Sequence, residues 1–233
     1  MSLPLNTICL HGLNNEDRPV GLGSGCLIRT EGELVLVGVQ HVVDNAKRWC
    51  IHLRIVPGRG SELYGFGAPT YFKRFSADDA EMLDLDFFAV VVPGELQPVH
   101  EEVKGLHSIS NPIPKRIFLL SDIARPEQDE RYSFFGAVAP TDTGAFLELK
   151  PQSEENMTFV EERPEHLIFQ LAGPHKDDAV YNGCSGAAIV DLKGRLVALV
   201  IGGSESANLI FGVPLHRYRS AIAVTAMEAL RTK

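Results

Sequence analysis

Short runs of apolar residues recur along the chain, separated by glycine, proline and charged residues. Each run has about four to eight residues and is rich in Val, Ile, Leu and Phe, which is the length and composition of strands rather than helices. The pattern therefore predicts an all-β protein. The predicted strands are residues 25–28, 33–39, 49–56, 86–92, 116–120, 131–138, 146–149, 166–171, 187–190, 196–201 and 209–213.

Two glycines mark predicted hairpin connections. Gly32 lies between the first two runs, and Gly194 lies between the runs 187–190 and 196–201. Glycine takes the left-handed backbone conformation that such turns require. Because no strand alternates with a long helical segment, a parallel sheet of β-α-β units is not expected.

Three segments depart from the strand pattern. Residues 214–233 predict a C-terminal helix, since their apolar residues partly follow one helical stripe and basic residues lie in the last turn. Residues 57–80, rich in glycine and polar residues, and the acidic residues 152–165 are predicted as loops. The apolar stripe of the helix consists of Leu215, Tyr218, Ile222, Met227 and Leu230.

Length and composition are those of a globular protein. The 233 residues are 45% hydrophobic and 22% charged, enough for two small barrels with a real core. The prolines of residues 111–114 predict a boundary between an N-terminal barrel, residues 1–108, and a C-terminal barrel with its helix, residues 109–233.

The net charge of −8 argues against nucleic acid or an anionic membrane as a partner. No window has the length of a membrane span, and residues 1–13 lack a signal-peptide pattern, so we expect a cytoplasmic location. The oligomeric state is left open.

The four cysteines, Cys9, Cys26, Cys50 and Cys184, are expected to be reduced thiols. A disulfide between Cys26 and Cys50 stays open as an alternative. Neither the cysteines nor the eight scattered histidines have the spacing of a metal site, so no metal or other cofactor is expected and a metal-dependent hydrolase is disfavoured.

A candidate nucleophile lies in the sequence Gly-Cys-Ser-Gly at residues 183–186. A serine between glycines at a tight turn can expose its hydroxyl, and the backbone N–H groups of Gly183 and Ser185 can converge on a developing oxyanion. By itself this pattern is common in plain loops. It is also not the nucleophile elbow of the α/β-hydrolases, because residue 187 is alanine and a strand-like run follows.

His41 and Asp86 supply the partners that a nucleophilic serine needs. His41 follows an apolar strand and alone would be read as a structural histidine. Asp86 opens the strand 86–92, where a partly buried carboxylate requires a partner such as an imidazole N–H. Asp84 is the rival carboxylate. The chain order His, Asp, Ser is that of the chymotrypsin class of serine proteases.

At these residues the sequence resembles the trypsin-like peptidases, most of all the HtrA/DegP-like branch, without a following PDZ domain. The similar segments are Gly-Ser-Gly-Cys-Leu-Ile at 23–28, Gln-His-Val-Val at 40–43, residues 177–190, residues 194–199 and Phe-Gly-Val-Pro at 211–214. The resemblance implies a chymotrypsin-like fold of two six-stranded antiparallel Greek-key β-barrels with a C-terminal helix.

The resemblance also implies roles for individual residues. His41 is the general base, Asp86 orients it, Ser185 is the nucleophile, and the N–H groups of Gly183 and Ser185 form the oxyanion hole. Cys184 departs from the pattern, because trypsins have an aspartate there and HtrA-like enzymes commonly an asparagine. The activation switch of trypsin, which uses that aspartate, is therefore not expected.

The resemblance further places a substrate pocket at Ala179, Ile201 and Gly203, which implies a small or medium apolar side chain before the scissile bond. The function expected from the sequence is a serine endopeptidase that cleaves protein or peptide substrates through an acyl-enzyme. The alternative is a catalytically inactive trypsin-like barrel protein that acts as a binding or regulatory module.

Overall fold

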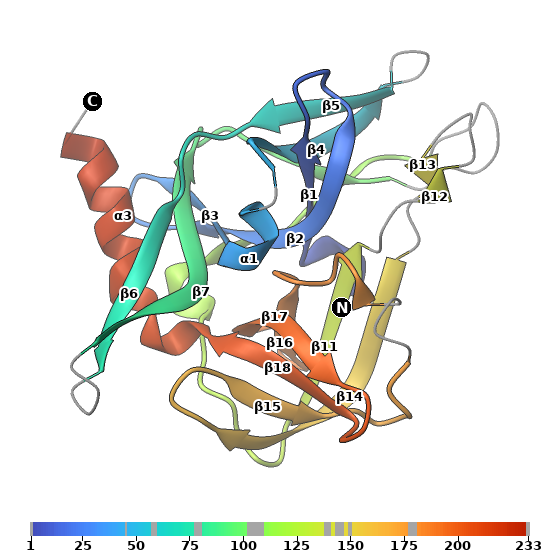
Figure 1. The fold of residues 1–233 in the computed structure, drawn as a ribbon, viewed down its shortest axis with the longest axis vertical. Coiled ribbons are helices and arrows are strands. Elements are labelled where there is room, and N and C mark those ends of the chain that lie inside the picture. Colours follow the sequence, from blue (N-terminus) through green and yellow to red (C-terminus); the bar gives the residue numbers. More distant parts are fainter. Residues whose placement is uncertain are drawn as a thin grey trace.

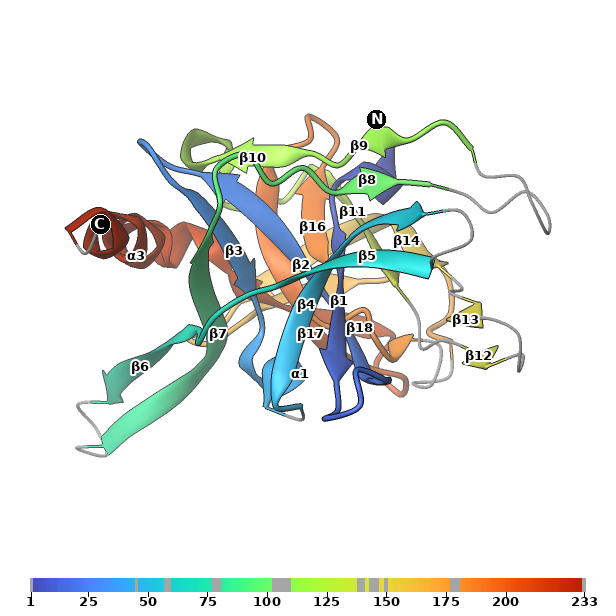
Figure 2. The same ribbon diagram turned by 90° about the horizontal axis from the view of Figure 1, so that it is seen from above.

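The computed structural model describes residues 2–44, 46–56, 60–76, 81–101, 110–137, 141–142, 147–148, 151–176 and 181–231. Most of these residues form β-strands, arranged in two groups with the short helix α1 (Gln40–Val43) between them (Figure 1). The strand-rich architecture confirms the predicted all-β class. The longest helix of the described residues is α3 (Arg219–Arg231), which contacts β3 and β7 along one flank (Figure 2).

The first group is an eight-stranded sheet in the order β5-β4-β1-β2-β3-β7-β6, with β10 pairing in parallel with β2. The resemblance to the trypsin-like peptidases implies a closed six-stranded barrel here, whereas this sheet is open. Among the described residues, β5 pairs with β4 alone and β6 with β7 alone. The two edges of the sheet are therefore joined by the connecting residues 66–69 and not by strand pairing. The strands are β1 (Ile8–Leu13), β2 (Pro19–Arg29), β3 (Leu34–Gly38), β4 (Arg48–Val56), β5 (Gly60–Gly65), β6 (Thr70–Ser76), β7 (Glu81–Val92) and β10 (Ile117–Leu119).

The second group closes into a six-stranded antiparallel barrel in the order β11-β14-β15-β18-β17-β16, as the resemblance to the trypsin-like peptidases implies. Short pairs and single helical turns lie outside the two groups. The barrel strands are β11 (Arg131–Ala137), β14 (Pro151–Glu162), β15 (Leu167–Gln170), β16 (Ala188–Asp191), β17 (Leu196–Ser204) and β18 (Leu209–Pro214). The remaining elements are β8 (Val99–His100), β9 (Ile113–Pro114), β12 (Thr141–Asp142), β13 (Leu147–Glu148), η1 (Leu3–Leu5), η2 (Leu120–Asp122) and η3 (Leu215–Arg217).

Both predicted hairpin glycines have the expected conformation. Gly32, between β2 and β3, has a φ of +96°, and Gly194, between β16 and β17, has a φ of +78°. The two predicted loops are wrong, because residues 57–80 contain β5 and β6 and residues 152–165 contain most of β14. The acidic side chains of β14 face solvent at several positions, and their polarity concealed the strand.

Two hydrophobic cores hold the fold together. The smaller lies within the closed barrel. The larger fills the first sheet and also takes in buried residues of the second half of the chain, which are Phe118, Ile123, Ala188, Val190, Leu196, Leu199, Val213, Leu215, Ile222 and Ala226. All four cysteines are free thiols.

The predicted boundary between residues 108 and 109 lies among residues outside the described ranges and stays a prediction. β10 lies beyond it and pairs with β2 of the first sheet. Among the helices that the structure describes, none combines the length and the apolar character needed to cross a membrane.

Candidate active site

His41 lies in the single turn of α1, directly after β3. Val42 and Val43, the next two residues, are buried and anchor this turn. The anchor depends on a glycine in β2, because a Cβ on Gly23 would overlap the Cγ1 atom of Val42. α1 is therefore seated directly on the backbone of β2, in the middle of the molecule (Figure 1).

Asp86 holds His41 by two hydrogen bonds. The imidazole Nδ1 and the carboxylate Oδ2 are 2.6 Å apart, and the backbone N–H of His41 donates to Oδ1 at 2.9 Å. The pairing of β3 with β7 brings the two residues together, since Gly38 lies opposite Phe88 at the end of that ladder. The side chain of Asp84, the rival carboxylate, is not among those that the structure describes.

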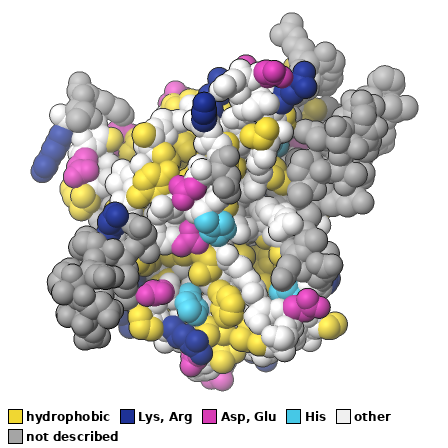
Figure 3. Space-filling view, viewed as in Figure 1, with side chains coloured by type: hydrophobic (Ala, Val, Ile, Leu, Met, Phe, Trp, Pro, Cys, Tyr) yellow, Lys and Arg dark blue, Asp and Glu magenta, His cyan; other side chains and the backbone are white. Residues whose placement is uncertain are grey.

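The pair is only partly shielded from solvent, with 48% of the His41 side chain and 35% of the Asp86 side chain exposed. Burial raises the pKa of the Asp86 carboxyl, but the hydrogen bonds from the His41 side chain and backbone outweigh it, so the pKa lies below its ordinary value. Figure 3 shows histidine and acidic side chains close together near the middle of this face.

The lowered pKa of Asp86 predicts a pH dependence of stability. Because the folded state favours the ionised carboxylate, its contribution is complete above the unfolded pKa of about 4 and is lost as the pH falls through the lower folded pKa. The free energy of unfolding can be measured with urea for wild type and Asp86→Asn between pH 7 and pH 2.5. The difference between the two proteins should be constant above about pH 5. Below about pH 4 that difference should shrink. A difference that stays constant down to pH 2.5 would contradict the assignment.

Ser185 lies in a turn whose peptides are fixed by backbone hydrogen bonds. The N–H of Cys184 donates to Tyr181 O and the N–H of Ala187 donates to Cys184 O, both at 2.8 Å. Gly183 is the third residue of the first turn and has a φ of +97°, a conformation that favours glycine. The N–H groups of Gly183 and Ser185 donate to none of the described residues.

Ser24 of β2 joins this turn to the first sheet. Its N–H donates to Ser185 O at 2.9 Å and its hydroxyl donates to Gly183 O at 2.8 Å. The structure thus brings His41 and Asp86 into direct contact and places the Ser185 turn on the same strand that seats α1. The Ser185 hydroxyl itself makes no hydrogen bond to a described residue, His41 included.

Cys184 points away from the site into the smaller core and is fully buried. A Cβ on Gly136 would lie 2.7 Å from its Sγ atom, so the thiol is tightly enclosed. Burial raises its pKa to about 12, with the Glu154 carboxylate adding to the effect. Cys184 is therefore a neutral packing residue, and the turn is anchored by apolar contact where the trypsin pattern has a charge.

The predicted substrate pocket is described only in part. Ala179 lies outside the described residues, Ile201 is half-buried against the larger core, and Gly203 is exposed. A Cβ on Gly203 would lie 2.7 Å from Nε2 of His175, whose ring packs on Tyr181 with 4.6 Å between the ring centres. Sequence reasoning missed His175, because no local signal links it to Gly203.

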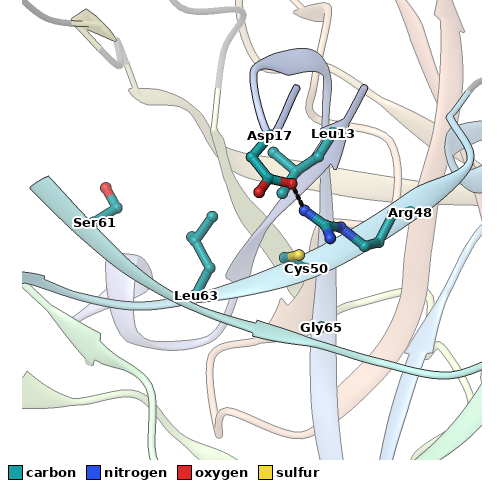
Figure 4. A pocket seen from close by; sticks show the side chains of 7 residues that line it. All are labelled: Leu13, Asp17, Arg48, Cys50, Ser61, Leu63 and Gly65. Atoms are coloured by element: carbon teal, nitrogen blue, oxygen red, sulfur yellow. Dashed lines mark ion pairs between the residues drawn. The ribbon is translucent and has the colours of Figure 1, made fainter. Parts of the chain in front are cut away.

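A separate hollow of about 360 Å³ lies on β1, β4 and β5 and contains none of the predicted site residues (Figure 4). An ion pair between Arg48 and Asp17 lies at its rim. Among the described residues no three His, Cys, Asp or Glu side chains are arranged to hold a metal ion. The hollow is lined by Leu13, Asp17, Arg48, Cys50, Ser61, Leu63 and Gly65.

Comparison with solved structures places this arrangement among known folds. The MamO protease domain from Magnetospirillum magneticum has a TM-score of 0.52 at 15% identity, covering 94% of this chain and 96% of that one. A mutant of tobacco etch virus protease has a TM-score of 0.51 at 9% identity, covering 94% and 78%. The product complex of the active tobacco etch virus protease has a TM-score of 0.50 at 9% identity, covering 91% and 73%.

The chain has the trypsin-like protease fold. At these identities the likeness establishes the fold alone. No protein-family model matches the sequence, and no curated protein matches it. Within the trypsin-like fold, the sequence motifs at 23–28, 40–43 and 183–186 lie together, because β2 contacts both α1 and the Ser185 turn.

Proposed function

We propose that this protein is a serine endopeptidase that hydrolyses peptide bonds through an acyl-enzyme on Ser185. The observation that carries the proposal is the double hydrogen bond between His41 and Asp86, at 2.6 Å and 2.9 Å. A carboxylate can only accept, so Nδ1 carries a proton, and in the neutral imidazole the lone pair then lies on Nε2. Nε2 is the atom that must take a proton from the serine hydroxyl.

In the proposed reaction, Ser185 Oγ attacks the substrate carbonyl carbon while His41 Nε2 accepts the hydroxyl proton. Asp86 stabilises the resulting imidazolium without becoming protonated. The oxyanion accepts hydrogen bonds from the N–H groups of Gly183 and Ser185, which donate to no other described residue. His41 then returns the proton to the leaving amine, and water repeats the sequence to release the acid. The absence of a bond between Ser185 and His41 fits the loose geometry common without substrate.

A fluorophosphonate probe tests the nucleophile. We expect it to label the wild type on Ser185, as mapped by mass spectrometry, and to leave Ser185→Ala unlabelled. Ser206→Ala, at an exposed serine of the same barrel, should label like the wild type. Wild-type protein that has not met the probe should also cleave an unfolded protein such as denatured casein, and prior labelling should abolish that cleavage. A folded wild-type protein that takes up no probe would instead favour the non-catalytic alternative.

A further inference from the structure

Ser24 stands out among the polar residues that the proposed mechanism does not use. It belongs to the Gly-Ser-Gly segment of β2 and has no exposed surface. β3 pairs with β2 only over Cys26–Arg29, so the backbone N–H of Ser24 lies beyond the end of that ladder. The strand therefore offers both a backbone donor and a side-chain donor to the second half of the molecule.

Both donors are used on the Ser185 turn. The hydroxyl donates to Gly183 O at 2.8 Å, and the N–H donates to Ser185 O at 2.9 Å. The carbonyl of Ser24 also packs on the turn, because a Cβ on Gly186 would lie 2.8 Å from its carbon atom. Each polar group of Ser24 thus contacts a different residue of the four-residue segment 183–186.

The residues that Ser24 binds are the same two that carry the oxyanion-hole N–H groups. Fixing the carbonyl of a residue restricts where its own N–H can point, since only φ and ψ separate the two groups. Oxyanion stabilisation requires donors held close to their productive positions before the reaction. A buried hydroxyl bonded at 2.8 Å supplies such a restraint.

We infer that Ser24 is a positioning residue, whose hydroxyl sets the oxyanion-hole geometry by holding Gly183. The inference rests on the proposed function for its catalytic consequence. The hydrogen bonds by which Ser24 holds the turn do not depend on catalysis and can be tested without it. The carbonyl of Gly183 has no other donor among the described residues, so removing the hydroxyl leaves it without a partner.

The test compares Ser24→Ala with a matched control, Thr7→Val. Thr7 is also buried, and its hydroxyl oxygen accepts a hydrogen bond from the N–H of Ala188, just beyond the turn. Both variants remove one buried hydroxyl that bridges the two halves, but only Ser24 binds the oxyanion turn. The first readout is the rate of fluorophosphonate labelling, and the second is amide hydrogen exchange of Cys184 and Gly186, measured against the barrel amides of Ala198 and Leu199.

We expect Ser24→Ala to label about 10- to 100-fold more slowly, somewhat less than the loss of a whole oxyanion donor. The turn amides should exchange at least about tenfold faster relative to the reference amides. Thr7→Val should stay within about threefold of wild type in both measurements. On a cleavable peptide, kcat should fall in Ser24→Ala while KM changes little, because the restraint acts on the transition state.

The outcomes distinguish a failure of the inference about Ser24 from a failure of the proposed function. Unchanged labelling of Ser24→Ala beside a reactive wild type would overturn the inference and leave the proposed function intact. Equal losses in Thr7→Val and Ser24→Ala would also overturn it, since general destabilisation would then explain both. If the wild type takes up no probe, the proposed function fails, and the exchange of the Cys184 and Gly186 amides alone decides whether Ser24 holds the turn.

Discussion

Replacing Asp86 with asparagine should lower kcat by about 10⁴-fold with little change in KM. The geometry explains why an isosteric change is so damaging. Oδ1 of Asp86 accepts the backbone N–H of His41, so the amide oxygen of an asparagine must occupy that place. Its NH₂ group then faces Nδ1, where Oδ2 accepts now. The imidazole is forced into the tautomer with its proton on Nε2, which cannot accept the proton of Ser185.

Steady-state cleavage of a peptide substrate at neutral pH measures this effect. Asp84→Asn is the matched control, because it removes a carboxylate two positions away in β7 and tests the rival assignment directly. We expect Asp84→Asn to retain activity within about threefold of wild type. Loss of activity in Asp84→Asn with a normal Asp86→Asn would reverse the assignment of the orienting carboxylate.

Gly186→Ala should destabilise the protein by about 3–5 kcal/mol and abolish labelling of Ser185. Two costs combine at this position. Gly186 has a φ of +88°, which a residue with a Cβ adopts only with strain. The added Cβ would also overlap the carbonyl oxygen of Ser24, which is backbone and cannot rotate away. Relief of the overlap requires the turn to separate from β2.

Urea unfolding followed by the fluorescence of Trp49, the single tryptophan, measures the loss. Gly173→Ala is the control, since a Cβ there would meet nothing within 4 Å, and a change below about 1 kcal/mol is expected. A Gly186→Ala protein as stable and as reactive as wild type would show that the contact between Ser24 and the turn is dispensable.

Local patterns predicted the parts of this fold that depend on neighbouring residues. The glycine turns at Gly32 and Gly194 follow from backbone conformation alone, and most strands follow from apolar runs. The strand β14 was missed because several of its exposed positions are acidic, among them Glu155, Glu161 and Glu162, and a strand with one solvated face can have the polarity of a loop. The apolar stripe predicted for the C-terminal helix is buried only in part. Met227 and Leu230 are exposed by 51% and 47%, while Ile222 and Ala226 are buried.

In the candidate site, too, local motifs were predicted and long-range contacts were not. Chain order and motif singled out His41, Asp86 and Ser185, and the contact between the first two is now described in atomic terms. Ser24 was visible only as part of a motif, because its partners lie far along the chain and no spacing rule connects them. Long-range contacts of this kind depend on how the two halves pack, which sequence periodicity does not encode.

The larger hydrophobic core has a thermodynamic consequence. It joins strands of the first sheet to Leu199 and Val213 of the closed barrel and to Ile222 and Ala226 of α3. Neither half can therefore expose its interior without disrupting the other, and folding should be one cooperative transition. The candidate site contains residues from both halves. Its residues gain their relative positions only when the whole chain has folded, so under the proposed function a partly folded chain would have no activity.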